Sequence, residues 1–369
     1  MRGTRPISNG EERMIPIVIP AYEPDERMLQ LLETLVAGGQ GPVVIVDDGS
    51  GDAYKEIFER AGAYVRALGG AVLTHEVNRG KGRALKTAFA YILSEYPEAA
   101  GCVTADSDGQ HTAECIDKVK ETLRENPDSL VLGVRRFDGE NVPWRSRMGN
   151  GITERVFAYV SGVHVTDTQT GLRGIPRAFM KELLDVPGER FEFETQMLLE
   201  CAGSYPVIEV PIQTIYDSKE NHQTHFNTFT DSVKIYRILA KKFMKYVFAS
   251  FSSCVLDLVL FTIFCSMLKG KTESYVAAAT VLARVISATC NYALNYKVVF
   301  ESKQKVHTSG VRYFLLAAVQ MGLSAFLVTA GCSLISTVPE TAVKVVVDGV
   351  LFFISYYIQQ NYVFRGKRK

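Results

Sequence analysis

The chain has 369 residues, and its 41 basic and 40 acidic side chains almost cancel. This balance argues against a general nucleic-acid-binding protein, which would carry a large positive excess. The length predicts two or three domains, and the hydropathy divides them: residues 1–230 are charged and punctuated by glycines, whereas residues 246–364 are overwhelmingly apolar.

The seven cysteines form no Cys-x-x-Cys pair, which favours buried thiols in a reducing compartment over a disulfide or zinc framework. The first 14 residues, MRGTRPISNGEERM, lack the apolar core of a cleavable secretory signal. We therefore expect the first domain to lie in the cytoplasm.

Apolar strands alternate with helical stretches in the first part of the chain. The runs Met14–Pro20 and Pro42–Val46 are short and β-branched, and the helical stretch Arg27–Ala37 separates them. Continuous apolar runs indicate strands covered on both faces, and their alternation with helices predicts a parallel α/β sheet. Ligands of such sheets bind beyond the carboxyl ends of the strands.

Pairs of acidic residues follow three of these strands. They are Glu23 and Asp25, Asp47 and Asp48, and Asp106 and Asp108. Any single pair is also compatible with a helix N-cap or a solvated turn. Three pairs at one predicted sheet edge favour a binding site instead.

The third pair lies in the stretch Val103–His111, VTADSDGQH. Gly109 allows the chain to turn here, so that both carboxylates, of Asp106 and Asp108, reach one site. Carboxylate oxygens together with an amide oxygen such as that of Gln110 suit Mg²⁺ or Mn²⁺ better than zinc. The stretch therefore predicts a hard-cation site that the phosphates of a substrate complete.

The segment Asn78–Arg83 (NRGKGR) opens a helix between the second and third acidic pairs. Glycines and basic side chains at a helix N-terminus predict an anion site, because free backbone N–H groups and the helix dipole both favour phosphate. Lys81 is the candidate ligand of a nucleotide phosphate. The segment is not a P-loop, because the spacing differs and no Ser or Thr follows Lys81. The alternative is a plain solvated loop.

Six motifs in chain order carry a resemblance to a known family: IPAYEPD, VIVDDGS, NRGKGRAL, TADSDGQH, GVRR and DTQTGLRG. Over residues 14 to about 240 the chain resembles the inverting nucleotide-sugar glycosyltransferases with a GT-A fold, and more narrowly the polyprenyl-phosphate hexose synthases. The resemblance implies an α/β, Rossmann-like GT-A catalytic domain, without hydride transfer or nucleotide hydrolysis.

The resemblance also implies roles for individual residues. The base and ribose of a nucleotide sugar would be held by Pro20, Ala21, Tyr22, Glu23 and Asp48. The metal that bridges the two phosphates would be held by Asp106, Asp108 and Gln110, with Asp106 and Lys81 also contacting the nucleotide sugar.

Arginines follow another predicted strand, Ser129–Leu132. Arginine side chains suit bidentate recognition of phosphate. In the family such arginines meet the lipid phosphate, and the resemblance carries this role to Arg135 and Arg147, which with Asp108 form the expected catalytic set. Arg145 is a further candidate, and an exposed basic face is the alternative. The only tryptophan, Trp144, is either an interfacial anchor or a core residue.

The stretch Asp167–Gly174 (DTQTGLRG) resembles the acceptor-side loop of the family. A phosphate monoester oxygen is already anionic at neutral pH, so the transfer does not require a general base. We expect catalysis to depend on alignment and on screening of the two anions, with the metal stabilising the departing diphosphate. His222 and His225, in a polar loop, are left out of the metal site.

The segment Asn227–Val247 has apolar residues on one helical face and lysines and an arginine elsewhere. A basic amphipathic helix directly before a long apolar run predicts a helix that lies in an anionic membrane surface. An ordinary helix packed on the first domain is the alternative.

Four apolar segments follow, and each exceeds the roughly 20 residues that a helix needs to cross a bilayer. They are Tyr246–Leu268, Tyr275–Tyr296, Tyr313–Ile335 and Ala342–Phe364. Basic residues precede the first segment, separate the second from the third and end the chain. The positive-inside rule therefore predicts a multi-pass protein of the cell membrane, with the catalytic domain and both termini in the cytoplasm.

Charged residues also fall within these spans, where unpaired charges are costly. Either Asp257 or Asp348 is therefore expected to pair with Arg284. The segments FASFSSCVLDLVLF, ARVISATCNYALNYKVVF and YYIQQNYVF resemble the GtrA-like four-helix family, which is associated with export of lipid-linked sugars.

Together these features predict a glycosyltransferase domain over residues 1–226, an amphipathic linker over 227–245 and an all-α domain of four transmembrane helices over 246–369. The predicted reaction is a metal-dependent, inverting transfer of a hexose from a nucleotide sugar to polyprenyl phosphate. The NRGKG segment favours UDP-glucose as the donor, with GDP-mannose as the nearest alternative.

Two other functions are rivals, and a pure membrane-anchor role for the four helices is a third alternative. A processive polysaccharide synthase should carry a Gln-x-x-Arg-Trp helix, which the sequence lacks. The other rival is a lipid-linked sugar translocase with an accessory glycosyltransferase domain. The expected partners are a nucleotide sugar, polyprenyl phosphate, the membrane and a second copy of the chain, without nucleic acid.

Overall fold

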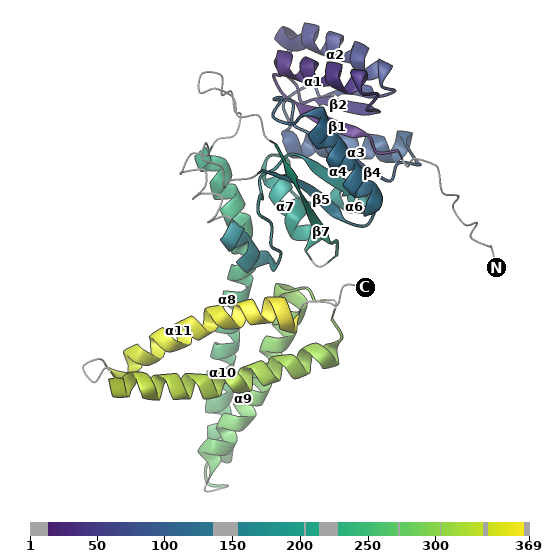
Figure 1. The fold of residues 1–369 in the computed structure, drawn as a ribbon. Helices are drawn as coiled ribbons and strands as arrows, with labels where there is room; N and C mark the ends of the chain where they lie inside the picture. The colour runs from purple at the N-terminus through teal and green to yellow at the C-terminus, as the bar shows by residue number, and fades with distance from the viewer. Residues whose placement is uncertain are drawn as a thin grey trace, which may run out of the picture. The chain divides into compact units, whose positions relative to one another are not determined.

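A computed structural model of the protein, shown in Figure 1, describes residues 14–135, 154–202, 204–213, 228–271, 274–302, 304–334 and 339–364. The chain divides into two compact units. The first comprises Met1–Arg155 and His164–Ile235, and the second comprises Val156–Val163 and Tyr236–Lys369. The short segment 156–163 therefore belongs with the apolar second unit, although it interrupts the sequence of the first.

A seven-stranded sheet forms the centre of the first unit, in the order β3-β2-β1-β4-β6-β5-β7. The strands are β1 Ile17–Ala21, β2 Val43–Asp47, β3 Ala71–Thr74, β4 Gly101–Thr104, β5 Leu130–Arg135, β6 Arg173–Pro176 and β7 Val207–Ile212. Strands β3, β2, β1 and β4 run parallel, and β5 and β7 are parallel to each other. Strand β6 is antiparallel to β4 and β5. This mixed, mainly parallel sheet is the Rossmann-like GT-A arrangement that the resemblance implied.

Helices cover both faces of this sheet (Figure 1). Helices α1 Glu26–Ala37, α2 Lys55–Ala67 and α4 Ala113–Glu125 bury their apolar residues on the face of Ile17 and Ile19. Helix α3 Lys81–Glu95 contacts both α6 Arg177–Leu183 and α7 Glu192–Cys201, and α3 and α6 pack on strands of the sheet. Val18 and Val44, which alternate with the first set, are also fully buried. The strands are therefore covered on both sides, which explains their continuous apolar runs.

One member of the first acidic pair, Asp25, is a helix cap, as the alternative to a binding site predicts. The Asp25 carboxylate accepts a hydrogen bond of 3.0 Å from the backbone N of Arg27 at the start of α1, and it also binds the Arg27 guanidinium. Asp25 is therefore a helix N-cap, which stabilises one of the unpaired N–H groups at the beginning of a helix.

The described part of the second unit has four helices long and apolar enough to cross a membrane: Ala240–Leu268, Tyr275–Val299, Val306–Leu334 and Glu340–Val363. They correspond to α8 Thr228–Leu268, α9 Tyr275–Leu294 with η2 Asn295–Val299, α10 Val306–Leu334, and α11 Glu340–Ile358 with η3 Gln359–Val363. These helices confirm the four predicted spans. Helix α8 is unbroken, so the predicted amphipathic segment and the first span form one helix, while the boundaries predicted at residues 226 and 245 stay predictions.

Aromatic side chains tie the segment 156–163 to the membrane helices. The rings of Tyr159 and Tyr356 lie 5.1 Å apart, and Phe243 packs on Tyr356 at 5.2 Å. The Tyr356 hydroxyl donates to the carbonyl of Val160 at 3.2 Å, and Gln360 Nε2 donates to the carbonyl of Ser161 at 3.0 Å. These contacts explain why the segment belongs to the second unit.

Asp257, Arg284 and Asp348, which fall within the spans, are each paired with an opposite charge, and this lowers their cost in a bilayer. Arg284 Nη2 lies 3.2 Å from Asp257 Oδ2, and Ser287 donates to the same carboxylate at 2.7 Å. Asp348 is paired instead with Lys344, at 2.8 Å. Of the two partners predicted for Arg284, the structure selects Asp257.

Candidate active site

The carboxyl ends of β2, β1 and β4 lie at one edge of the sheet, because these neighbouring strands are parallel. Residues that follow these strands include all three predicted acidic pairs. Asp25 is used as a helix cap, so the remaining carboxylates are the candidates for ligand binding. The two that follow β4, Asp106 and Asp108, form the centre of the site.

Asp106 is surrounded by charged and polar side chains from three other parts of the chain. Lys81 Nζ, at the first residue of α3, lies 2.7 Å from Asp106 Oδ1 and 3.0 Å from Glu194 Oε1 of α7. The buried imidazole of His111 has its Nε2 3.5 Å from Asp106 Oδ2. The side chain of Asp106 is 29% exposed, against 16% for Lys81 and 10% for Glu194. Asp106 is therefore the most accessible member of the group.

The charges of this cluster stabilise one another. Burial alone would lower the pKa of Lys81, but the carboxylates of Asp106 and Glu194 outweigh it and raise the pKa above its ordinary value. Burial would likewise raise the pKa of Asp106, but the Lys81 ammonium and His111 outweigh it and lower the pKa. Lys81 and Asp106 are therefore an ion pair throughout the physiological pH range.

The pKa of Asp108 is shifted in the opposite direction to that of Asp106. Its pKa is raised, first because burial disfavours the carboxylate and second because the negative charge of Asp106 is close. A divalent cation between the two carboxylates would relieve this repulsion, so the donor set fits Mg²⁺ or Mn²⁺.

The rest of the metal coordination would come from groups other than acidic side chains. In the described residues, no group of three His, Cys, Asp or Glu side chains forms a metal site by itself. The backbone N of Gln110 donates to Asp108 Oδ1 at 3.1 Å, which places Gln110 beside the pair. The metal set of Asp106, Asp108 and Gln110, completed by substrate phosphates, stays a prediction.

The predicted acceptor loop lies directly against Asp106. A Cβ atom added to Gly171 would come within 2.1 Å of Asp106 Oδ2. The loop is held by Thr104, whose hydroxyl donates to the Gly171 carbonyl at 2.7 Å. Fully buried Arg173 donates to the carbonyls of Thr170, Thr168 and Glu194. The absence of a side chain at Gly171 is therefore what allows the loop to approach the carboxylate.

Asp48 faces inward rather than toward an open site, and only 3% of the residue is exposed. Its Oδ1 accepts from Arg79 N at 3.0 Å and lies 2.7 Å from His75 Nδ1, while its Oδ2 accepts from Gly80 N at 2.7 Å. The carboxylate thereby fixes the loop that leads into α3. Any contribution of Asp48 to nucleotide binding would act through the position of this loop.

Replacement of Asp48 by alanine is expected to destabilise the first unit, because two backbone N–H groups and the His75 ring would lose a buried acceptor. Each buried group left without a partner costs about 1–3 kcal/mol of unfolding free energy. Urea denaturation of the detergent-solubilised protein would measure the loss. Asp52→Ala, at an exposed position, is the matched control; equal stability of the two variants would contradict this role of Asp48.

The N-terminus of α3 differs from the predicted anion site. Arg79 N and Gly80 N donate to Asp48, and Arg83 N donates to the Glu189 carbonyl at 3.0 Å. Several of the backbone N–H groups that were expected to meet a phosphate are thus already bonded within the protein. The part of the segment that reaches Asp106 is the side chain of Lys81.

The other residues that are predicted to bind the nucleotide lie at the end of β1. Pro20 and Ala21 are buried in the strand, whereas Tyr22 and Glu23 are partly exposed. Glu23 adopts a left-handed conformation, with φ of 49°, and its N donates to Ser50 Oγ at 2.9 Å. Strained non-glycine residues of this kind cluster at functional sites. The roles in base and ribose binding stay predictions.

The arginine expected at the lipid phosphate is already paired. Arg135 Nε and Nη2 donate to both oxygens of Asp167, at 2.7 and 3.0 Å, and Asp167 is fully buried. This bidentate pair fixes the orientation of the Arg135 guanidinium. Several other candidates lie outside the described residues: Arg145, Arg147, Trp144, His222 and His225.

Sequence reasoning did not assign roles to Glu194, His75 and Arg173. Glu194 lies in the run FEFE, which marks a helix start but gives no hint of a lysine partner. The lone histidine His75 also carries no local signal. Arg173 and His111 stood within the motifs DTQTGLRG and TADSDGQH, but neither motif indicated what these two side chains contact.

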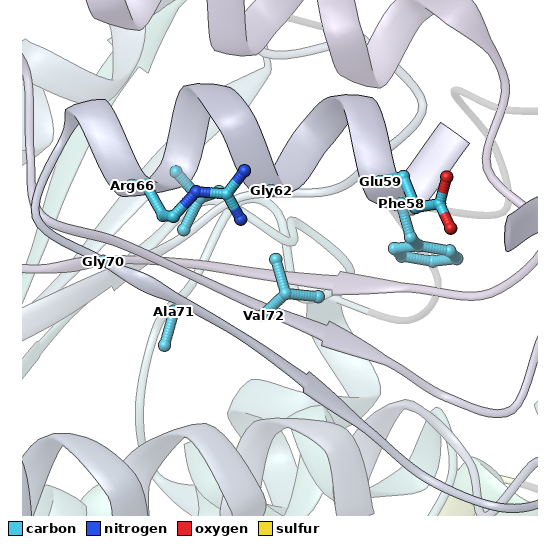
Figure 2. Close-up of a pocket in the computed structure, with 8 residues that line it drawn as sticks. Phe58, Glu59, Gly62, Arg66, Gly70, Ala71 and Val72 are labelled. Atoms are coloured by element: carbon cyan, nitrogen blue, oxygen red, sulfur yellow. The ribbon is translucent and has the colours of Figure 1, made fainter. Parts of the chain in front are cut away.

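A separate pocket lies between α2 and the edge strand β3, and Figure 2 shows its lining. Phe58, Val65 and Val72 supply apolar surface, and Glu59 and Arg66 supply opposite charges. None of its lining residues is a predicted site residue. It is therefore distinct from the carboxylate cluster.

Two family models match the chain. The model described as "Glycosyl transferase family 2" matches residues 17–184, and the model described as "GtrA/DPMS, transmembrane domain" matches residues 245–364. The first match includes strands β1 to β6. The second match begins within α8 and includes the other apolar helices in full.

Three curated relatives match between 55% and 63% of this chain. An uncharacterised protein of Methanocaldococcus jannaschii is 31% identical over 238 residues, 63% of this chain and 92% of the relative. A UDP-N-acetylglucosamine–dolichyl-phosphate N-acetylglucosaminyltransferase of Methanococcus voltae is 29% identical, covering 56% of this chain and 87% of the relative. A dolichyl-phosphate beta-glucosyltransferase of Saccharomyces cerevisiae is 26% identical, covering 55% of this chain and 67% of the relative.

Proposed function

Because the chain belongs to glycosyl transferase family 2, among the dolichyl- and undecaprenyl-phosphate glycosyltransferases, and carries a GtrA/DPMS transmembrane domain, we propose that it transfers glucose from UDP-glucose to a polyprenyl phosphate. The product is a polyprenyl-phosphate β-hexose. The observation that carries the proposal is the cluster of Asp106, Asp108 and Lys81 beyond the carboxyl ends of β1 and β4.

The proposed reaction exchanges one phosphate oxygen for another at the anomeric carbon. An anionic oxygen of the lipid phosphate forms the new bond to C1, the bond between C1 and the diphosphate breaks, and the nucleoside diphosphate leaves with inversion. A bound Mg²⁺ or Mn²⁺, held by Asp106, Asp108 and Gln110, would supply Lewis-acid stabilisation of the departing diphosphate.

Side chains of the protein would bind the two substrates and screen their charges. The acceptor is already ionised, so no side chain has to remove a proton. Lys81 would place a positive charge beside the diphosphate, and Arg135 and Arg147 would screen the lipid phosphate from the donor. The four helices would bring the lipid to the catalytic unit. We propose that this unit lies on the cytoplasmic side, because basic residues flank the spans in the way that the positive-inside rule predicts for that side.

The reaction class rests on the family, whereas the proposed sugar rests on the NRGKG segment. One relative is named for N-acetylglucosamine and another for glucose, so related chains act on different sugars. Glucose is proposed because the NRGKG segment favours it, with mannose from GDP-mannose as the alternative. Selectivity depends on the shape of the sugar pocket.

The deciding experiment incubates the purified full chain with undecaprenyl or dolichyl phosphate and a panel of UDP- and GDP-hexoses, and detects lipid products by mass spectrometry. We expect one product, from UDP-glucose, that disappears when a chelator is added and returns with Mn²⁺ or Mg²⁺. A product from GDP-mannose alone would correct the donor. Absence of any product while the lipid still binds would favour the translocase function.

A further inference from the structure

We infer that Glu194 is a positioning residue that holds Lys81 beside the metal site and keeps Asp106 available to a divalent cation. The inference rests on the proposed function, because it assigns a task within the same site. Glu194 is not among the residues implied by the family resemblance. It enters the site only through the packing of α7 on α3.

The Lys81 ammonium is shared between two carboxylates. Its distances to Asp106 Oδ1 and Glu194 Oε1 are 2.7 and 3.0 Å, so both are hydrogen-bonded ion pairs. An ammonium group has three donors, so these two carboxylates leave one for a phosphate oxygen. The lysine can therefore serve the diphosphate without leaving its partners.

The backbone around Glu194 is held rigidly. Arg173 Nη1 donates to the Glu194 carbonyl at 2.7 Å. A Cβ atom added to Gly82 would come within 2.6 Å of Phe193 Cβ, so α7 and the start of α3 are in close contact. Lys86 lies 5.0 Å from the centre of the Phe193 ring and forms an ion pair with Glu189. The position of Glu194 relative to Lys81 is thus set before any ligand binds.

A second partner for Lys81 matters because the ammonium and a divalent cation compete for Asp106. Two positive charges a few ångströms apart repel each other, and the repulsion is strong in a partly buried site. Glu194 offers the ammonium a place to remain when the cation takes the Asp106 oxygen. Without Glu194, Lys81 has only Asp106 as its partner, and binding of the cation must break the sole ion pair.

A double-mutant cycle on the full chain in detergent tests this role, with Mn²⁺ alone as the probe and isothermal titration calorimetry as the measurement. We expect Glu194→Gln to weaken Mn²⁺ binding about tenfold, which corresponds to about 1.4 kcal/mol. In the Lys81→Met background the same substitution should change the affinity less than about twofold, because the lysine through which it acts is gone.

Glu192→Gln is the matched control. Glu192 lies in the same turn of α7, and its carboxylate accepts from the backbone N of Glu189 and Arg190, not from Lys81. We expect this variant to bind Mn²⁺ as the wild type does. An equal loss for Glu194→Gln in both backgrounds, or a loss that follows a lowered melting temperature, would show a direct electrostatic or structural role and overturn the inference.

The binding measurement separates this inference from the proposed function. If the wild type binds Mn²⁺ and the cycle behaves as expected, but no sugar lipid forms, the proposed reaction is wrong and the role of Glu194 is retained. If product forms but Glu194→Gln binds Mn²⁺ normally, the inference is wrong and the reaction is retained. A wild type that binds no Mn²⁺ would overturn the inference together with the metal assignment.

Discussion

Replacement of Asp108 by asparagine is expected to lower the rate of sugar transfer by at least about 10²-fold, the loss typical when one group that stabilises developing charge is removed. The amide keeps the size of the side chain but lacks the negative charge that the cation needs. Asp108 already sits beside the carboxylate of Asp106, and this raises its pKa together with burial. Two neighbouring carboxylates in one site are the oxygen ligands that a divalent cation prefers.

The measurement is the initial rate of lipid product with the donor saturating, at increasing Mn²⁺ concentrations. Asp52→Asn is the control, since Asp52 is exposed and lies in the short helix η1 Asp52–Tyr54. We expect the control to retain the wild-type rate. Wild-type turnover of the Asp108 variant at saturating metal would remove Asp108 from the metal site.

Substitution of Gly171 by alanine should lower the rate of sugar transfer nearly as much as Asp108→Asn does, but for a steric reason. The new methyl group would meet Asp106 Oδ2 at 2.1 Å and Asp106 Cγ at 2.5 Å, distances that real atoms do not adopt. Either the loop or the carboxylate must move by about 1 Å, and a displacement of that size costs about 10²-fold in rate. Gly171 does not have a positive φ, so the loss would come from the contact with Asp106 rather than from backbone strain.

The rate of product formation and the melting temperature should both be measured for Gly171→Ala. Gly38→Ala is the matched control, because Gly38 also has a negative φ and an added Cβ there makes ordinary contacts at 3.5 Å. A slow enzyme with a near-normal melting temperature is the expected result. Full activity would mean that the acceptor loop does not constrain Asp106 during the reaction.

The sequence did not distinguish the helix cap Asp25 from the site residue Asp106. Both follow a buried strand of the parallel part of the sheet. Asp25 directly precedes α1 and turns back to the N–H of Arg27, whereas Asp106 meets a lysine of α3 and a glutamate of α7. The partners of Asp106 come from elements that are distant in the chain, so the sequence around Asp106 does not indicate them.

The sequence by itself determined the elements that depend on local pattern. The apolar runs of β1 and β2 must be buried on both faces, and four long apolar stretches must form helices to satisfy their backbone groups in a bilayer. The alternation of strands and helices was enough to bring the acidic strand ends to one edge of the sheet. These features follow from hydropathy and backbone chemistry over short distances.

Only the tertiary structure decided which of these side chains act together. The turning of Asp48 toward His75 and Gly80, the sharing of Lys81 between Asp106 and Glu194, and the placement of segment 156–163 with the membrane helices all depend on packing. A charged side chain selects its partner by proximity and burial, and both are set by how whole helices pack on the sheet. No spacing along the chain encodes that choice.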